Sequence, residues 1–473
     1  MRINVLDETQ IEEIKKSTEY IIENMGFHVT NDRILKLAAR AGAKVDETAG
    51  VIKLPAVLLR ELLALVPSRY IIRGIDGKEY EIGSGRQFCH AIVTDPWIVD
   101  YKTQRPRRPC LRDVINHTII AQKLEHVAAI SRMDFPVADY NDAASSLRAL
   151  EMHLLNHSKH NFVYAGSLES FQQWMELGDI MSQGSEKDKS RLMSVAVAVV
   201  SPLTLTEINA EFLLGAAAKG FAIIPTICPM AGTTSPYSKD TTLLLGNAEN
   251  IFLAALTQII NPGNPFLYAF GPSRSNMRTG HDMYYTMDKV LWKAAAVELS
   301  KSYGIPAAAE CGGTMTYRYD QQNGAEGMIF MLAAQNTGAD FLCGIGSCHN
   351  ANGMSAEMML IQSAWLEAAR FLSEGLSTAN LGKGVESITN GGYGANFLTD
   401  DLTLELLRSR EFFDNKLFDF TGGYGAAPSM LENAHAEAEK LISSYISPVP
   451  AGMQEDLRHY FEDLYKGQKR VKL

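Results

Sequence analysis

Short apolar segments alternate with longer amphipathic segments through the middle of this chain of 473 residues. Strands that are buried on both faces read as nearly continuous apolar runs, so this rhythm predicts a parallel sheet covered by helices. The strands that we expect span residues 128–131, 161–165, 193–200, 222–227, 265–270, 306–310 and 340–344. The helices that we expect between and after them include residues 168–181, 206–218, 241–260, 288–303 and 355–374.

Seven strands over this length favour a closed barrel over an open doubly wound sheet, because no Gly-rich phosphate loop follows the first strand. We therefore expect an α/β fold, namely a TIM (β/α)8 barrel with an N-terminal helix and hairpin module and a C-terminal helical extension. The module spans residues 1–110, the barrel 111–425 and the C-terminal helices 426–473. The eighth strand has a weak signal, and residues 387–389 or a segment near Leu417 are its candidates.

Composition narrows the class of protein. Hydrophobic residues make up 46% of the chain and the formal net charge is -10, with a single basic cluster at Arg105, Arg107 and Arg108. A nucleic-acid-binding protein would normally carry a basic stripe. Uninterrupted apolar runs of about 20 residues are absent, and the first residues read as a charged helix instead of a signal peptide. We expect a cytoplasmic protein without nucleic-acid or membrane partners.

Loops that follow the predicted strands are rich in Gly, Ser and aromatic residues, and in a barrel these loops form the site. Aromatic faces attract alkylammonium ions through their ring quadrupoles. Each ring could instead serve packing, but as a group they predict a box for an organic cation. The rings that we assign to substrate binding are Trp97, Tyr101, Tyr164, Tyr268, Phe270 and Tyr317.

Charged residues lie in the same loops. Arg274, Arg318 and His349 are candidates to bind a substrate carboxylate, or they are structurally paired charges. Glu310 ends an apolar strand, so its carboxylate should face the barrel mouth. It would act there as a counter-ion to a cationic nitrogen or as a structural, hydrogen-bonded glutamate.

Cys311, Cys343, Cys348 and His349 suggest zinc at first sight, because thiolate and imidazole are its usual ligands. Their spacing matches no common zinc motif, and buried cysteines often serve as small apolar residues. Hydrolase signatures such as HExxH, the P-loop and GxSxG are also missing. We therefore expect that the chain binds no metal.

Several segments resemble the trimethylamine:corrinoid methyltransferase family. Residues 312–326 read Gly-Gly-Thr-Met-Thr-Tyr-Arg-Tyr-Asp-Gln-Gln-Asn-Gly-Ala-Glu, where the family has a glycine-rich segment before Asp-x-Gln-x3-Glu. The similarity continues through Thr337-Gly-Ala-Asp340, Gly344-x-Gly346 and Ser355-x-Glu357. It extends to Gly391-Gly-Tyr-Gly-Ala-Asn-Phe-Leu398 before Thr403-Leu-Glu405, and it covers most of the chain.

Two departures from the family pattern matter. Trimethylamine-specific members carry a pyrrolysine after the sixth strand, whereas residues 312–316 are all ordinary amino acids. Many members have His-Thr where this chain has Leu402-Thr403, so a role of that histidine does not carry over. The resemblance thus implies the branch without pyrrolysine, which demethylates quaternary amines such as glycine betaine, proline betaine or carnitine. Glu310, Gly312, Gly313 and Asp320 are the catalytic residues that it suggests.

The resemblance also implies the partners. The methyl acceptor would be the Co(I) corrinoid (cobalamin) of a separate protein, with no cofactor bound by this chain, in one-carbon metabolism of the methanogenic or acetogenic type. We further expect a homo-oligomer. A quaternary ammonium leaves as a neutral amine, so such an enzyme needs positioning and desolvation more than acid catalysis. The alternatives are a zinc-dependent thiol or alcohol:corrinoid methyltransferase and a non-catalytic quaternary-ammonium-binding protein.

Overall fold

A curled sheet of parallel strands forms the centre of the protein in the computed structural model, which describes residues 2–141, 144–409 and 411–468. The strand order in this sheet is β13-β11-β10-β9-β6-β18-β17, and every pairing within it is parallel. The strands are β6 (Phe88–Ile92), β9 (Val127–Ser131), β10 (His160–Val163), β11 (Met193–Ala198), β13 (Ala222–Thr226), β17 (Ala308–Glu310) and β18 (Phe341–Ile345).

Residues 266–268 lie between the two outer strands of this sheet. One parallel bridge joins Ile223 of β13 to Phe266, and another joins Tyr268 to Ala307, the residue before β17. The segment therefore contacts both edges of the sheet, although it is too short to count as a strand of its own. This agrees with the predicted strand at residues 265–270 in position, but not in length.

The strand that sequence reasoning missed is β6, which pairs with β9 and β18 inside the sheet. It precedes the first predicted strand and lies within the region assigned to the N-terminal module. The two segments proposed for the eighth strand do not form strands. Residues 387–389 belong to helix α13 (Leu381–Gly391), and Leu417 is a buried loop residue.

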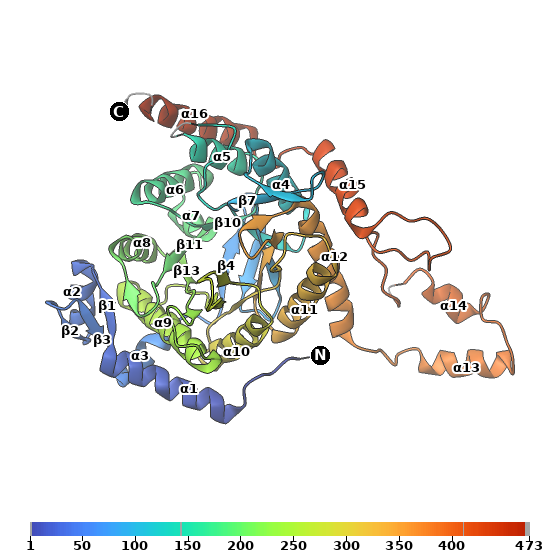
Figure 1. Cartoon of the computed structure of the whole chain (residues 1–473), viewed down its shortest axis with the longest axis horizontal. Helices are drawn as coiled ribbons and strands as arrows, with labels where there is room; N and C mark the ends of the chain where they lie inside the picture. Colours follow the sequence, from blue (N-terminus) through green and yellow to red (C-terminus); the bar gives the residue numbers. More distant parts are fainter. Residues whose placement is uncertain (1, 142–143, 410, 469–473) are drawn as a thin grey trace.

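Helices surround the sheet on its outside (Figure 1). Each predicted helix is present within about three residues, because the apolar stripe that sets its position faces the sheet. The surrounding helices are α4 (Leu111–Lys123), α5 (Ser145–Leu154), α6 (Leu168–Met181), α7 (Glu186–Leu192), α8 (Glu207–Ala217), α9 (Lys239–Ile260), α10 (Asp288–Ser302), α11 (Gln321–Thr337) and α12 (Ala356–Glu374).

The N-terminal residues add two small structures. Helices α1 (Glu8–Tyr20), α2 (Asp32–Arg40) and α3 (Ala56–Leu63), with the π-helical turn Ile21–Met25, accompany strands β1 (Phe27–Val29), β2 (Lys44–Asp46) and β3 (Val51–Lys53). β1 also pairs with β12 (Thr204–Leu205). The hairpin of β4 (Tyr70–Arg73) and β5 (Glu79–Ile82) shares a buried apolar cluster with the inner face of the central sheet.

Helix α9 is long and apolar enough to cross a membrane by composition, but 83% of its most apolar window is buried inside the protein. It is therefore the central packing helix of the largest apolar cluster. The chain ends in α13, α14 (Asp401–Leu406), α15 (Met430–Ser443) and α16 (Ala451–Gln468).

Candidate active site at the carboxyl ends of the strands

Alternation along the strands separates residues that point inward from those that face the helices. Phe162, Ile224, Leu267, Ala308 and Phe341 form a buried inner layer together with the β4–β5 hairpin, which fills the amino ends of the strands. Two residues further along each segment, the inward-facing residues are only partly buried, namely Tyr164, Thr226, Ala269, Glu310 and Cys343. The interior is therefore filled at the amino ends of the strands and accessible to solvent at their carboxyl ends. We call these five partly buried residues the mouth residues.

Glu310 is the charged member of the mouth, and it is paired within the protein. Its Oε2 lies 3.0 Å from the Nζ of Lys289 and 3.0 Å from the Nζ of Lys293, both on α10. Tyr284 donates a hydrogen bond from its hydroxyl to Oε1 at 2.7 Å. Lys293 also donates to the carbonyl oxygen of Phe270. Glu310 thus reaches the mouth as the sequence predicted, but its charge is already matched by two ammonium groups.

The charge states in this cluster follow from burial and from the uneven pairing. Burial alone would raise the pKa of Glu310, but the ammonium groups of Lys289 and Lys293 outweigh it and lower that pKa to about 2. Burial lowers the pKa of Lys289 to about 7, and Lys293 adds to this effect while Glu310 opposes it. Glu310 is therefore ionised at neutral pH, and Lys289 is the group that titrates there. With both lysines protonated, the cluster carries one excess positive charge.

Cys343, the cysteine of the mouth, is a thiol at neutral pH, because burial raises its pKa to about 12. A thiolate is the form that attacks or ligates metals, so this side chain is not activated. Within the described part of the chain, no three His, Cys, Asp or Glu side chains are grouped so that they could hold a metal ion. Cys311 is buried, with its Sγ 3.3 Å from the carbonyl oxygen of Cys343.

Asp95, which follows β6, is a candidate that sequence reasoning missed. Its residue is 7% exposed, and burial raises the pKa of its carboxyl to about 7. Among the residues that the structure describes, this carboxylate has neither a hydrogen-bond partner nor an ion-pair partner. Asp95 comes three residues after the end of β6, so it lies at the carboxyl end of a strand of the central sheet, as the mouth residues do. A buried, unpaired carboxyl group is costly unless a ligand compensates it.

The predicted aromatic box is only partly assembled. Tyr268 and Phe270 belong to the outer face of their segment, where Tyr268 donates a hydrogen bond to Asn247 and Phe270 packs against Gly246. The structure thus places these two rings in the core and not on the mouth. Their inward neighbour is Ala269, which the alternation along the segment requires. Tyr164 is the predicted ring that lies on the inner face.

Trp97 and Tyr101 lie on the hairpin of β7 (Trp97–Asp100) and β8 (Arg105–Arg107). Their faces are covered by residues of the same chain. The guanidinium group of Arg108 lies 4.1 Å from the centre of the Trp97 ring. Tyr101 stacks on His435 at 3.6 Å between ring centres, and His435 in turn contacts Glu357 at 2.8 Å. Trp97 therefore already has a cationic partner.

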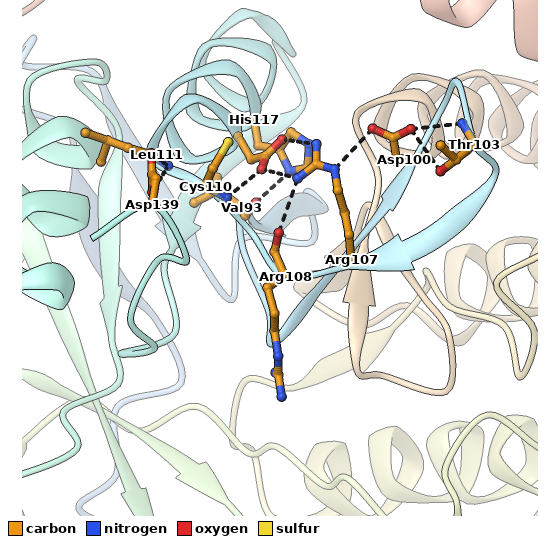
Figure 2. Close-up of polar contacts among 10 residues, drawn as sticks. Val93, Asp100, Thr103, Arg107, Arg108, Cys110, Leu111, His117 and Asp139 are labelled. Atoms are coloured by element: carbon orange, nitrogen blue, oxygen red, sulfur yellow. Dashed lines mark hydrogen bonds and ion pairs between the residues drawn. The ribbon is translucent and has the colours of Figure 1, made fainter. Parts of the chain in front are cut away.

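Arg107 fixes this hairpin to the body of the protein (Figure 2). It forms two hydrogen bonds with Asp113 of α4, at 2.6 and 2.8 Å, and a third with Asp100 at 3.1 Å. Burial would raise the pKa of Asp113, but the guanidinium group of Arg107 holds it below its usual range. His117, one turn along α4, contacts the carbonyl oxygen of Val93 at 2.8 Å. The basic cluster of the sequence is thus partly a structural anchor.

The remaining charged candidates have local partners. Arg318 contacts Asp320 at 2.7 Å, and Asp320 caps α11 by accepting from the backbone of Asn323. Arg274 lies 3.4 Å from Asp288. His349 packs edge-to-face on Tyr317, with 5.4 Å between ring centres. These contacts favour the structural interpretation that the sequence left open for the arginines.

Gly312 and Gly313 permit close approach of neighbouring backbone and side chains. A Cβ atom on Gly312 would lie 2.1 Å from the carbonyl oxygen of Gly344. Gly313 has a φ of +119°, and a Cβ there would lie 2.0 Å from the Tyr285 ring. Neither of these two positions, which follow Glu310 closely in the sequence, has room for a side chain. This accounts for the glycines by packing, and a direct catalytic role for them stays a prediction.

A parallel sheet with surrounding helices, and a polar cluster at the carboxyl ends of its strands, defines the architecture of an α/β enzyme. The family model for trimethylamine methyltransferase (MTTB) matches residues 1–465. The chain belongs to this family, which makes it a methyltransferase.

Named relatives are similar along nearly their whole length. Glycine betaine methyltransferase of Desulfitobacterium hafniense is 26% identical over 454 residues, which is 94% of each chain. Trimethylamine methyltransferase MttB of Methanosarcina thermophila is 23% identical over 473 residues, or 97% of each chain. The crystal structure of the Methanosarcina barkeri monomethylamine methyltransferase (MtmB) superimposes with a TM-score of 0.50 at 12% identity, covering 98% of this chain and 92% of that one. This likeness concerns the fold alone.

Proposed function

We propose that this protein moves a methyl group from a quaternary amine of the betaine type to the Co(I) corrinoid of a partner protein. The site would lie inside a closed (β/α)8 barrel, in which residues 266–268 take the place of the eighth strand between β13 and β17. Membership of the methyltransferase family and the similarity to a glycine betaine methyltransferase support this reaction.

The observation that carries the proposal is the pair of buried lysines that share one carboxylate. Lys289 and Lys293 both contact the same oxygen of Glu310, so one positive charge at the mouth lacks an anionic partner. The carboxylate of a betaine would supply it. The Tyr164 ring, which follows β10 and is four strands away from β17 in the sheet, and the unpaired Asp95 carboxylate suit a quaternary ammonium. The mouth would thus match both ends of a zwitterion.

The proposed reaction needs little from the protein beyond this placement. Co(I) supplies the electron pair that forms the new Co–C bond, and the C–N pair stays on nitrogen as the N–CH3 bond breaks. The amine leaves neutral, so no proton has to be delivered. This suits a mouth in which the Cys343 thiol is protonated and Glu310 is held between two lysines. Excluding water and holding the methyl carbon in line would supply most of the catalysis.

The test is a donor panel with free Co(I) cobalamin as acceptor, assayed with and without added zinc. We expect methylcobalamin from glycine betaine or another carboxylated quaternary amine, and none from methanol, thiol methyl ethers or trimethylamine. Zinc-stimulated transfer from a thiol or alcohol donor would support the zinc-dependent alternative instead. Tight binding of betaines without transfer to free cobalamin or to a corrinoid protein would identify a binding protein.

A further inference from the structure

The loop between β19 (Ser347–Cys348) and β20 (Gly353–Met354) contains a turn of left-handed backbone made of residues that carry side chains. His349, Asn350 and Ala351 have φ angles of +52°, +54° and +60°. Residues other than glycine adopt this conformation singly, because their Cβ atom lies too close to the following carbonyl oxygen. Three in a row persist only where the surrounding structure holds them, and such strain is typical of functional sites.

Backbone hydrogen bonds fix this turn to the loop that follows β17. The N–H group of His349 donates to the carbonyl oxygen of Thr316 at 3.0 Å. The N–H group of Asn350 donates to the carbonyl oxygen of Thr314 at 2.9 Å. Because Glu310 is the last residue of β17, the turn is attached to the segment that leads away from the charged residue of the mouth.

The side chain of Asn350 clamps the segment that carries Tyr284. Its Oδ1 accepts a hydrogen bond from the backbone N–H of Tyr284 at 2.7 Å and a longer one from that of Tyr285 at 3.4 Å. Its Nδ2 donates to the carbonyl oxygen of Asp282 at 2.7 Å. Three backbone groups of one four-residue segment are therefore bound by a single amide that lies 66 residues further along the chain.

Tyr284 in turn arranges the charge cluster of the mouth. Its hydroxyl binds Oε1 of Glu310, and its ring centre lies 2.7 Å from the Nζ of Lys289. With Oε1 occupied by Tyr284, Lys289 and Lys293 both contact Oε2, each at 3.0 Å. A carboxylate has two accepting oxygens, so without Tyr284 each lysine would have an oxygen of its own. The shared oxygen, and with it the unmatched ammonium charge, depends on the position of Tyr284.

The same loop also holds the neighbouring ring. Tyr285 donates a hydrogen bond from its hydroxyl to the Oγ of Ser347 at 3.1 Å, and Ser347 lies two residues before the turn. The rings of Tyr284 and Tyr285 pack edge-to-face, with 5.1 Å between their centres. One loop thus positions both tyrosines, the first through the Asn350 amide and the second through a serine hydroxyl.

We propose that Asn350 is a positioning residue of the mouth, which holds Tyr284 on Glu310 so that both lysines share one oxygen and leave a charge for a substrate carboxylate. The left-handed turn is then retained because it aims this amide at residues 282–285. Asn350 acts through Tyr284 and does not have to touch the substrate. The inference rests on the proposed function for its substrate, but the clamp can be tested without any ligand.

A double-mutant cycle between Asn350→Gly and Tyr284→Phe tests the clamp itself. Glycine adopts left-handed backbone freely, so Asn350→Gly removes the amide and keeps the turn. Tyr284→Phe removes the hydroxyl that binds Glu310. In urea unfolding, Tyr284→Phe should raise the unfolding equilibrium constant about 10-fold or more in the wild type, as for a hydrogen bond to a charged group. In the Asn350→Gly background it should raise it less than ~3-fold, and additive effects would overturn the proposal.

Methyl transfer from glycine betaine to free Co(I) cobalamin supplies the functional test. Ala351→Gly is the matched control, because it places glycine in the same turn without removing a polar side chain. Asn350→Gly should raise KM at least ~10-fold with kcat changed less than ~3-fold, since the carboxylate is bound before and during the reaction. The preference for glycine betaine over choline should fall by a similar factor. Asn350→Asp keeps an acceptor for the Tyr284 N–H and should recover part of the loss.

The outcomes separate the clamp from the proposed reaction. If the wild type transfers methyl groups from no donor but the cycle shows coupling, the proposed function fails and the clamp stands. If the wild type is active and Asn350→Gly keeps its KM and kcat, the positioning role is wrong and the proposed function stands. An equal fall in activity for Asn350→Gly and Ala351→Gly would show that the turn serves only folding, and would also overturn the proposal.

Discussion

Lys289 and Glu310 form a buried ion pair at the carboxyl end of β17, with 3.0 Å between the Nζ and Oε2 atoms. Because Lys293 lies at the same distance from the same oxygen, one carboxylate balances two ammonium groups. The stability of the site depends on this uneven cluster, and the proposed preference for a carboxylated substrate rests on it.

Replacing Glu310 by Gln should destabilise the protein strongly. The substitution leaves two buried lysines without their anion, and breaking a buried pair typically costs about 3–5 kcal/mol. Urea unfolding at pH 7 measures the change. Asp463→Asn, which removes an exposed partner of Lys466 on α16, is the matched control and should leave the midpoint unchanged. An equal response of the two variants would show that the cluster is not a buried ion pair.

Asp95 should make the protein less stable as pH rises. The pKa of its carboxyl is about 7 in the folded protein, raised by burial from 3.8. The folded state therefore binds more protons than the unfolded state between these values, so the free energy of unfolding falls from about pH 4 to about pH 7. The Asp95→Asn variant should lack this pH dependence. At pH 8 its free energy of unfolding should be higher than that of the wild type by up to ~4 kcal/mol. Chemical unfolding at pH 5 and 8 tests this, and parallel curves for the two proteins would contradict it.

Lys289 should make binding of carboxylated donors sensitive to pH. Its pKa of about 7 means that the ammonium form, which attracts a carboxylate, is lost as pH rises through neutrality. Glycine betaine should therefore lose affinity relative to choline, which lacks a carboxylate, between pH 6 and 8.5. Calorimetric titration with both ligands gives the ratio of their dissociation constants. Because both ligands carry the same quaternary ammonium group, any effect of Asp95 on that group cancels in the ratio. Lys289→Met should remove the pH dependence of this ratio.

The Tyr164 ring should contribute to binding through its face. Tyr164→Leu is expected to weaken binding of a quaternary amine by about 5- to 30-fold, in line with ~1–2 kcal/mol for a desolvated cation–π contact. Tyr164→Phe keeps the ring and should bind nearly as well as the wild type. Tyr268→Phe serves as a control, because it removes only the hydrogen bond to Asn247 in the core. If the Leu and Phe variants bind equally, the ring makes no such contact.

The sequence predicted most of the sheet because buried parallel strands and amphipathic helices have distinct periods. It missed β6 because Phe88–Ile92 is a short segment that follows two hairpin strands and resembles them. It placed Tyr268 and Phe270 in the site because they end a strand, but the side of a strand that a residue faces depends on its register with the neighbouring strands. Ala269, the actual inward residue, carries no chemical signal.

The lysines of the site were missed for a different reason. They lie on helix α10, which precedes β17, whereas the sequence interpretation expected site residues only in the loops that follow strands. Lys289 and Lys293 are four residues apart on a helix that is otherwise mostly apolar on that face, which is a usable signal for a buried charge pair. Glu310 was found because a carboxylate that ends an apolar strand is conspicuous. Its partners came only from the packing of α10 against β17.

Transfer of an isotopically labelled methyl group tests the central claim most directly. Glycine betaine labelled with carbon-13 in its N-methyl groups is incubated with the enzyme and excess Co(I) cobalamin, and the products are analysed by mass spectrometry. The account predicts labelled methylcobalamin and dimethylglycine in equal amounts, without added zinc. Absence of label from the cobalamin with glycine betaine, proline betaine and carnitine alike would contradict it.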